Sequence, residues 1–174
     1  MIHFERGFDP ALIRAIATHP QVWRHISDDH SPAVDDYLPP DPRHVLYVMV
    51  RDIYPDSGPE ELLGFYLFHP LNSICWEVHT CLLPAAWGPR AQQAGCLITE
   101  WIFEHTPCRR IVTNVPVYNR VALAYAKRAG LVEYGRNPAS FLKDGKLHDQ
   151  ILLGISPRWG TVDIKTSEKE AVCH

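Results

Sequence analysis

The side chains best suited to acid–base chemistry alternate along residues 75–82. In a β-strand, successive side chains point to opposite faces, so Glu77 and His79 would share one face with Cys75 and Cys81. An imidazole titrates near neutral pH, and a neighbouring carboxylate can exchange protons with it or with a bound substrate. We therefore treat Glu77 and His79 as candidate catalytic residues.

Three other interpretations of these residues stay open. Glu77 and His79 can form a structural pair on a partly solvated sheet face, because structural pairs also perturb pKa values. Cys75, His79 and Cys81 are metal-ligand types, but the sequence offers no second cluster, so we expect no metal. A Cys–His acyl-enzyme would need a third, orienting partner, and the sequence does not identify one.

A tight turn and a helix are predicted directly after this strand. Gly88 and Pro89 mark the turn, and apolar residues then recur at helical spacing from Ala94 to Ile102. The first turn of a helix has N–H groups without helical partners, and it carries the positive end of the helix dipole. This arrangement suits a bound phosphate.

Other elements must position the strand and the turn. Strand patterns predict strands at 2–5, 45–53, 62–71, 74–83 and 109–115, and a final hairpin around Asp144–Gly145. Capping residues, helix-breaking residues and apolar periodicity predict helices at 10–18, 21–27 and 89–106. A further helix is capped by Asn119 and ends near Gly130. Pro20 is expected to close the first helix.

The order of these elements predicts an α/β fold. The strand–turn–helix–strand segment in the middle needs a crossover between parallel strands, whereas the flanking segments form antiparallel hairpins. We expect a mixed, mostly antiparallel central sheet of about seven strands with helices on both faces. At 174 residues the chain suits one domain, which we place at residues 1–155, followed by a polar tail at 156–174.

Composition excludes several classes of protein. The formal net charge is -3, and no basic run occurs, so we expect no nucleic-acid partner. The sequence contains no stretch of about 18 apolar residues, the length that a membrane-spanning helix needs. The first residues also lack the apolar core of a secretory signal. Five cysteines without a C-x-x-C pair suit a reducing, cytoplasmic setting.

The segment 28–44 is rich in proline and aspartate and has no periodicity. A loop of this length is often a lid or a binding wall. Its five aspartates could attract a cationic substrate, or they could serve as turn and cap residues of a solvated loop. Further residues could line an acceptor pocket or have surface or core roles: Trp23, His25, Asp28, His148 and Asp149.

Two motifs together resemble the GNAT superfamily of N-acetyltransferases. The sequence AAWGPRAQQAG is similar to the family's pyrophosphate loop, with Gly88 at its first glycine and Arg90 at its second. The sequence NRVALAYAKRAGL fits the pattern N-x-x-A-x(7)-G-[FL], beginning at Asn119 and containing Gly130. The resemblance covers residues 2–155, and small divergent members of this kind occur in phages and prophages.

The resemblance implies an acetyl-CoA-dependent N-acetyltransferase without a metal. The acceptor would be a primary amine, either a small molecule or a peptide amino terminus, that attacks the thioester directly in a ternary complex. Glu77 would be the general base and His79 the second candidate, while backbone N–H groups near Leu82 and Leu83 would stabilise the oxyanion. The residues expected on acetyl-CoA are Leu82, Leu83, Trp87, Gly88, Pro89, Arg90, Ala91 and Asn119.

The resemblance leaves two positions at variance with the family pattern. Arg90 replaces a glycine, so we expect either a contact between its guanidinium and a CoA phosphate or a displaced loop. Many relatives have a tyrosine that protonates the leaving thiolate, and Ala126 stands at that position here. Tyr125, one residue earlier, is the candidate acid or a core aromatic.

These two departures keep open a GNAT-like binding or structural module without catalysis. Transfer of a longer acyl chain also stays open, since it depends on the depth of the pocket. We expect a monomer or a homodimer.

Overall fold

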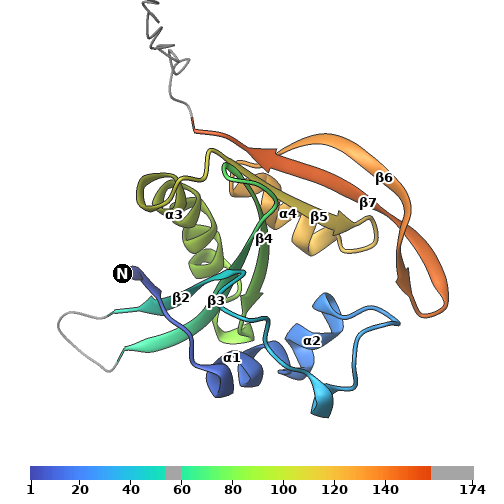
Figure 1. The fold of residues 1–174 in the computed structure, drawn as a ribbon, viewed down its shortest axis with the longest axis horizontal. Helices are drawn as coiled ribbons and strands as arrows, with labels where there is room; N and C mark the ends of the chain where they lie inside the picture. The colour runs from blue at the N-terminus through green and yellow to red at the C-terminus, as the bar shows by residue number, and fades with distance from the viewer. Residues whose placement is uncertain (54–59, 158–174) are drawn as a thin grey trace, which may run out of the picture.

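The computed structural model describes residues 1–53 and 60–157. Most of the turn YPDSGPEE between the strands expected at 45–53 and 62–71, and most of the expected tail, including Cys173, lie outside the described residues. Within them the chain forms one mixed sheet in the order β1-β2-β3-β4-β5-β7-β6, flanked by helices (Figure 1). The strands are β1 (Ile2–Arg6), β2 (Leu46–Asp52), β3 (Glu61–Pro70), β4 (Cys75–Leu82), β5 (Arg110–Pro116), β6 (Val132–Lys143) and β7 (Lys146–Ile155).

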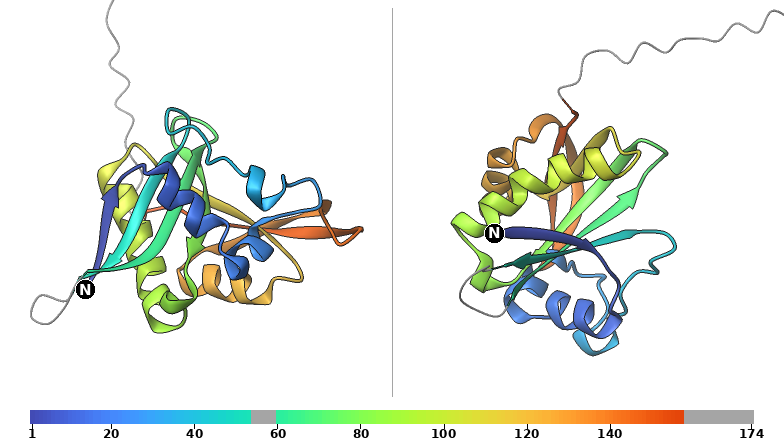
Figure 2. Two further views of the ribbon diagram at one scale, coloured as in Figure 1. Left: turned by 90° about the horizontal axis from the view of Figure 1, so that it is seen from below. Right: turned by 90° about the vertical axis from the view of Figure 1, so that its left-hand side faces the viewer.

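The helices cover both faces of the sheet, as the sequence predicts. The right-hand view of Figure 2 shows α1 and α2 on one side and α3 and α4 on the other. The four α-helices of the described residues are α1 (Pro10–Ala17), α2 (Pro20–Ile26), α3 (Pro89–His105) and α4 (Arg120–Arg128), with short 3₁₀ turns η1 (Val34–Asp36) and η2 (Pro84–Ala86). The α/β architecture with a mostly antiparallel sheet is confirmed.

Local sequence signals explain where the first helices begin. Asp9 accepts hydrogen bonds from the Ala11 and Leu12 N–H groups at 3.0 Å, which caps α1. Pro20 was expected to close α1 but is instead the first residue of α2. A proline is tolerated at that position because the first N–H of a helix has no helical acceptor to lose.

Strands β4 and β5 separate soon after they meet. They pair in parallel only from Cys75–Glu77 to Arg110–Val112, and β5 then continues as the partner of β7. Figure 1 shows the two strands diverging. From Val78 onward β4 keeps only β3 as its partner, so a gap opens within the sheet beside the second half of β4.

The terminal hairpin reaches back to the long loop after α2. Asp144 and Gly145 both have positive φ, 52° and 69°, as a two-residue turn of type I′ requires. The Asp29 carboxylate accepts the N–H groups of both turn residues, at 2.8 and 2.7 Å. The loop 28–44 is therefore held against the hairpin tip.

No helix in the two described ranges is long and apolar enough to cross a membrane. Four cysteines fall in these ranges, and all are free thiols: Cys81 and Cys108 are buried, Cys75 is half-buried and Cys96 is exposed.

Candidate functional site

A cavity of about 450 Å³ occupies the gap between β4 and β5. On the α1/α2 side it is lined by Trp23, His25 and Tyr37, and on the α3/α4 side by Ile98 and Tyr125. Since one cavity is lined from both faces of the sheet, two molecules that enter from opposite faces could meet within it.

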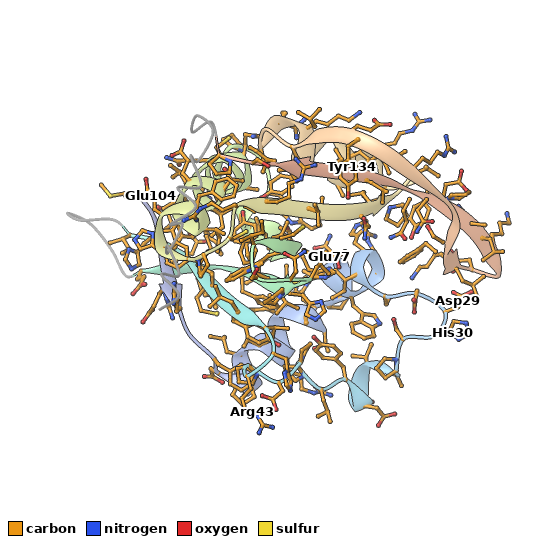
Figure 3. All side chains as sticks on the ribbon, turned by 45° about the horizontal axis from the view of Figure 1, so that its top comes forward. Asp29, His30, Arg43, Glu77, Glu104 and Tyr134 are labelled. Carbon is orange, nitrogen blue, oxygen red and sulfur yellow. The ribbon has the colours of Figure 1, made fainter. Side chains whose placement is uncertain are left out.

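Glu77 lines this cavity, and Figure 3 shows it near the middle of the molecule. Its Oε1 accepts a hydrogen bond of 2.9 Å from the Asn114 amide on β5, and its Oε2 lies 3.8 Å from His79 Nε2. The Glu77 side chain is 18% exposed, whereas that of His79 is 49% exposed. The structure therefore places both predicted residues together on one face of β4, with Glu77 deeper than His79.

Partial burial lowers the pKa of His79, the Glu77 carboxylate opposes this shift, and His69 adds to it. An imidazole with a lowered pKa is neutral at pH 7 and can accept a proton. The pair Glu77–His79 can therefore pass a proton from the cavity toward solvent.

The sequence analysis missed Asn114. Its position on β5 is two residues beyond the last β4–β5 pair, so its amide spans the opening gap to reach Glu77. The sequence signal was weak, because Arg110 and Thr113 are further polar residues of the same strand. Asn114 is exposed, so its hydrogen bond with the candidate base could not be inferred from burial.

Tyr125 points from α4 toward β3 and α3. Its hydroxyl lies 2.6 Å from the Tyr66 hydroxyl, and a Cβ atom on Gly95 would lie 2.7 Å from it. Burial raises the pKa of Tyr125 to about 12, and hydrogen bonding with Tyr66 and Thr80 opposes the shift. Tyr125 is therefore protonated at neutral pH and can donate a proton on this side of the cavity.

Ala126 packs among small apolar residues between α4 and the sheet, although it also borders the cavity. Tyr66 and Gly95 were not singled out by the sequence, because their relation to Tyr125 exists only after α3 and α4 pack on the sheet.

The start of α3 has the form of an anion site. Gly88 is the N-cap residue with φ 93° and ψ -136°, and no side chain caps the helix. The first hydrogen bond of the helix runs from the Gln92 N–H to the Gly88 carbonyl at 3.0 Å, so the Ala91 N–H precedes it. A Cβ at position 88 would meet nothing within 4 Å, so the glycine serves the backbone conformation rather than space.

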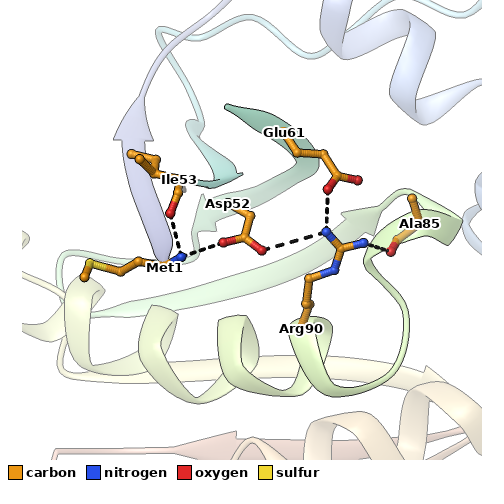
Figure 4. A network of polar contacts seen from close by, with 6 residues as sticks. All are labelled: Met1, Asp52, Ile53, Glu61, Ala85 and Arg90. Atoms are coloured by element: carbon orange, nitrogen blue, oxygen red, sulfur yellow. Dashed lines mark hydrogen bonds and ion pairs between the residues drawn. The ribbon is translucent and has the colours of Figure 1, made fainter. Parts of the chain in front are cut away.

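Arg90 directs its side chain to the edge formed by β2 and β3 (Figure 4). Its Nη1 lies 2.5 Å from Glu61 Oε2 and 3.8 Å from Asp52 Oδ2, and its Nη2 donates to the Ala85 carbonyl. The guanidinium thus neutralises carboxylates and holds η2 against α3. The two alternatives for Arg90, a contact with a CoA phosphate or a displaced loop, stay predictions.

Some of the backbone groups at the end of β4 already have hydrogen-bond partners. The Leu83 N–H donates to the Leu63 carbonyl at 2.8 Å, and the Leu82 carbonyl accepts the indole N–H of Trp87 at 3.0 Å. Since backbone groups alternate in direction along a strand, the N–H groups of Thr80 and Leu82 face the gap. The oxyanion donor expected near Leu82 and Leu83 is therefore restricted to the Leu82 side.

The remaining predicted residues divide into two groups. Trp23, His25 and Asn119 line the cavity, and Asn119 also caps α4 through the Ala122 N–H at 3.1 Å. Asp28, His148 and Asp149 do not line the cavity. Asp28 accepts hydrogen bonds from the His30 N–H and the Ser31 hydroxyl, and His148 packs on Tyr118. Asp149 accepts hydrogen bonds from Arg136 and the Ala139 N–H. Within the described part of the chain, no group of three or more metal-ligating side chains occurs.

Comparisons with known proteins give matches of structure only. No family model and no curated protein sequence matches the chain. A spermidine N-acetyltransferase from Vibrio cholerae, in complex with CoA and spermine, is similar with a TM-score of 0.72 at 15% identity, over 89% of this chain and 95% of that one. A probable acetyltransferase (GNAT family) from Chromobacterium violaceum has a TM-score of 0.67 at 17% identity, over 89% and 82%. At these identities the likeness shows the fold alone.

Proposed function

We propose that this chain, which has the fold of the GNAT acetyltransferases, is an acetyl-CoA-dependent N-acetyltransferase acting on a primary amine. The observation that carries the proposal is the cavity through the β4–β5 gap, with Glu77 on one face of the sheet and Tyr125 on the other. Base and acid would then stand on opposite sides of a thioester placed in the gap.

The proposed reaction is a direct transfer. A carboxylate at Glu77, acting directly or through water, accepts a proton from the ammonium form of the acceptor, which is mostly protonated at neutral pH. The nitrogen lone pair then forms the C–N bond at the thioester carbonyl, the C–S bond breaks, and its electron pair leaves on sulfur. Tyr125 donates its proton to the thiolate, the adduct nitrogen gives its second proton to solvent, and solvent returns a proton to the tyrosinate. Glu77 releases its proton to solvent, which leaves the amide, free CoA and the enzyme in its starting form.

The backbone would supply the remaining interactions. The Leu82 N–H faces the gap, where it can donate to the oxyanion of the tetrahedral intermediate. The start of α3 at Gly88 and Ala91 would hold the pyrophosphate of acetyl-CoA through N–H groups and the helix dipole. Arg90 contributes by fixing η2, which precedes this turn.

The test is binding followed by turnover. Isothermal titration should detect acetyl-CoA binding at micromolar concentration, and amines should release free thiol in its presence. Glu77→Gln should lower kcat/KM at least about tenfold with little change in acetyl-CoA binding, because only the base is lost. Glu104→Gln, an exposed carboxylate on α3, is the matched control and should keep full activity. Absence of acetyl-CoA binding at high micromolar concentration would overturn the proposal.

A catalytically inactive binding module is the second candidate. Two observations favour it. The indole N–H of Trp87 donates to the Leu82 carbonyl, and Ala126 lacks the hydroxyl that many family members have at this position. Acetyl-CoA binding without thiol release from any amine would support this alternative.

A further inference from the structure

The α1/α2 side of the cavity has an aromatic and apolar wall beside the polar side chains of His25 and Ser27. The wall is formed by Trp23, Tyr37, Leu67 and Phe141, and the rings of Trp23 and Tyr37 meet edge to face with centroids 5.3 Å apart. Among the described residues that line the cavity, Glu77 is the only carboxylate, and none is a lysine or an arginine. The cavity therefore offers one site for one positive charge and an aromatic wall for the rest of a ligand.

Charged side chains of both signs lie near the cavity without lining it. Asp28 and Asp29 accept backbone N–H groups of the loop and of the hairpin tip, and with Asp144 they act as negative charges on Tyr118. Arg24 and Lys143 both contribute positive potential at His25, which borders the cavity, and Lys143 Nζ donates to the Ser27 carbonyl at 2.9 Å. A ligand with several ammonium groups would find a single carboxylate, that of Glu77, among the described residues that line the cavity.

These features separate two classes of amine. Every additional ammonium group brought out of water needs a partner, and an unpaired charge in an apolar site is strongly unfavourable. An aromatic ring gains from burial against Trp23 and Tyr37, both through lost apolar surface and through edge-to-face geometry.

We infer that the acceptor is a small primary monoamine with a short alkyl chain ending in an aromatic ring. This inference rests on the proposed function. The amino group would lie at Glu77, between the Asn114 amide and the gap, and the ring would lie between α2 and the loop 28–44. The transfer itself is unchanged: the amine gains the acetyl group, the ammonium proton passes to the carboxylate side, and CoA leaves with a proton from Tyr125.

The experiment compares two probes on the full chain. Thiol release is measured with 2-phenylethylamine and with spermidine, at saturating acetyl-CoA. We expect kcat/KM for 2-phenylethylamine to exceed that for spermidine at least tenfold. Titration of the CoA-saturated protein with each amine measures binding without turnover and should give the same order of affinity.

A pair of variants tests the aromatic wall. Trp23→Ala should lower kcat/KM for 2-phenylethylamine at least tenfold while leaving acetyl-CoA binding unchanged, which also shows that the variant folds. Tyr134→Ala removes an exposed aromatic ring on β6, outside the cavity, and should leave turnover unchanged. Equal loss in both variants, or no loss in Trp23→Ala, contradicts the inference.

The outcomes distinguish a failure of this inference from a failure of the proposed function on which it rests. If acetyl-CoA binds and spermidine, or a peptide amino terminus, is acetylated as well as or better than 2-phenylethylamine, the inference fails and the proposed function stands. If acetyl-CoA does not bind, or if it binds and no amine is acetylated, both fail.

Discussion

Glu77 stands between two side chains that act differently on its carboxylate. The Asn114 amide donates to Oε1 from the neighbouring strand, while His79 lies near Oε2 on the same strand. A donated hydrogen bond from a neighbouring strand fixes the orientation of the carboxylate. In the proposed reaction Asn114 is therefore a positioning residue, which acts on the substrate only through Glu77.

Removing the Asn114 amide should weaken catalysis without removing the base. We expect Asn114→Ala to lower kcat/KM about tenfold, the usual order for losing a hydrogen bond to a charged group. The loss should fall on catalysis and not on acetyl-CoA binding or Tm, because the base stays in place and loses only the side chain that orients it. Steady-state kinetics, isothermal titration with acetyl-CoA and a thermal scan would measure these effects.

Asn137→Ala is the matched control, since it removes an amide from β6 that does not line the cavity. A loss of activity accompanied by a matching loss of acetyl-CoA binding and of Tm would mean that Asn114 has only a structural role.

Single residues were predictable from sequence where local geometry decides them. The shared face of Glu77 and His79 follows from strand alternation alone, and the turn at Gly88 follows from helix-start chemistry. The partners of Arg90 and Tyr125 were not predictable. Glu61 and Tyr66 are far from them in sequence and become neighbours only when α3 and α4 pack on the sheet.

At the scale of elements, Asp29 joins the loop 28–44 to the β6–β7 hairpin. The N–H groups of Gly145 and then Asp144 lower the pKa of Asp29. Because the folded pKa lies below the unfolded value of about 3.8, the charged carboxylate stabilises the fold above that value, and the contribution is lost as pH falls through the folded pKa.

We expect Asp29→Asn to lower Tm by a few degrees at pH 7, since the amide is a weaker acceptor for two N–H groups. The difference from the parent should shrink as the pH falls from about 5 toward 3, where the parent also loses its charge. Scanning calorimetry across this range is the measurement. Asp35→Asn, in the same loop at η1, is the control and should show no such trend; a pH-independent difference for Asp29→Asn would contradict the assignment.

The elements themselves were largely predictable, since caps, turn residues and periodicity agree with one another. Pro20 is the exception, because a proline can follow the end of one helix or begin the next, and the sequence fits both. The structure decides between them, since the His19 side chain accepts the Gln21 N–H at the start of α2. The separation of β4 from β5 was not predictable from local pattern either, because nothing in the sequence of either strand marks the residue at which their pairing ends.

At the scale of the whole molecule, the sheet separates the helices on its two faces and is interrupted by the gap between β4 and β5. The order β4-β5-β7 leaves the gap, and helices on both faces form its walls. The sequence predicted the sheet, its two covered faces and the strand on which Glu77 and His79 share one face. It did not predict that one cavity crosses from face to face, because a cavity is defined by side chains from distant elements.

This opening has a consequence for the kinetics of the proposed enzyme. If donor and acceptor reach the gap from opposite faces, neither closes the path of the other, so no obligatory order of addition is imposed. Initial rates should give intersecting double-reciprocal lines. CoA should compete with acetyl-CoA but not with the amine, and the acetylated amine should compete with the amine alone. Parallel lines would instead require a covalent acetyl-enzyme, and the two substrates would then no longer need to occupy the gap together.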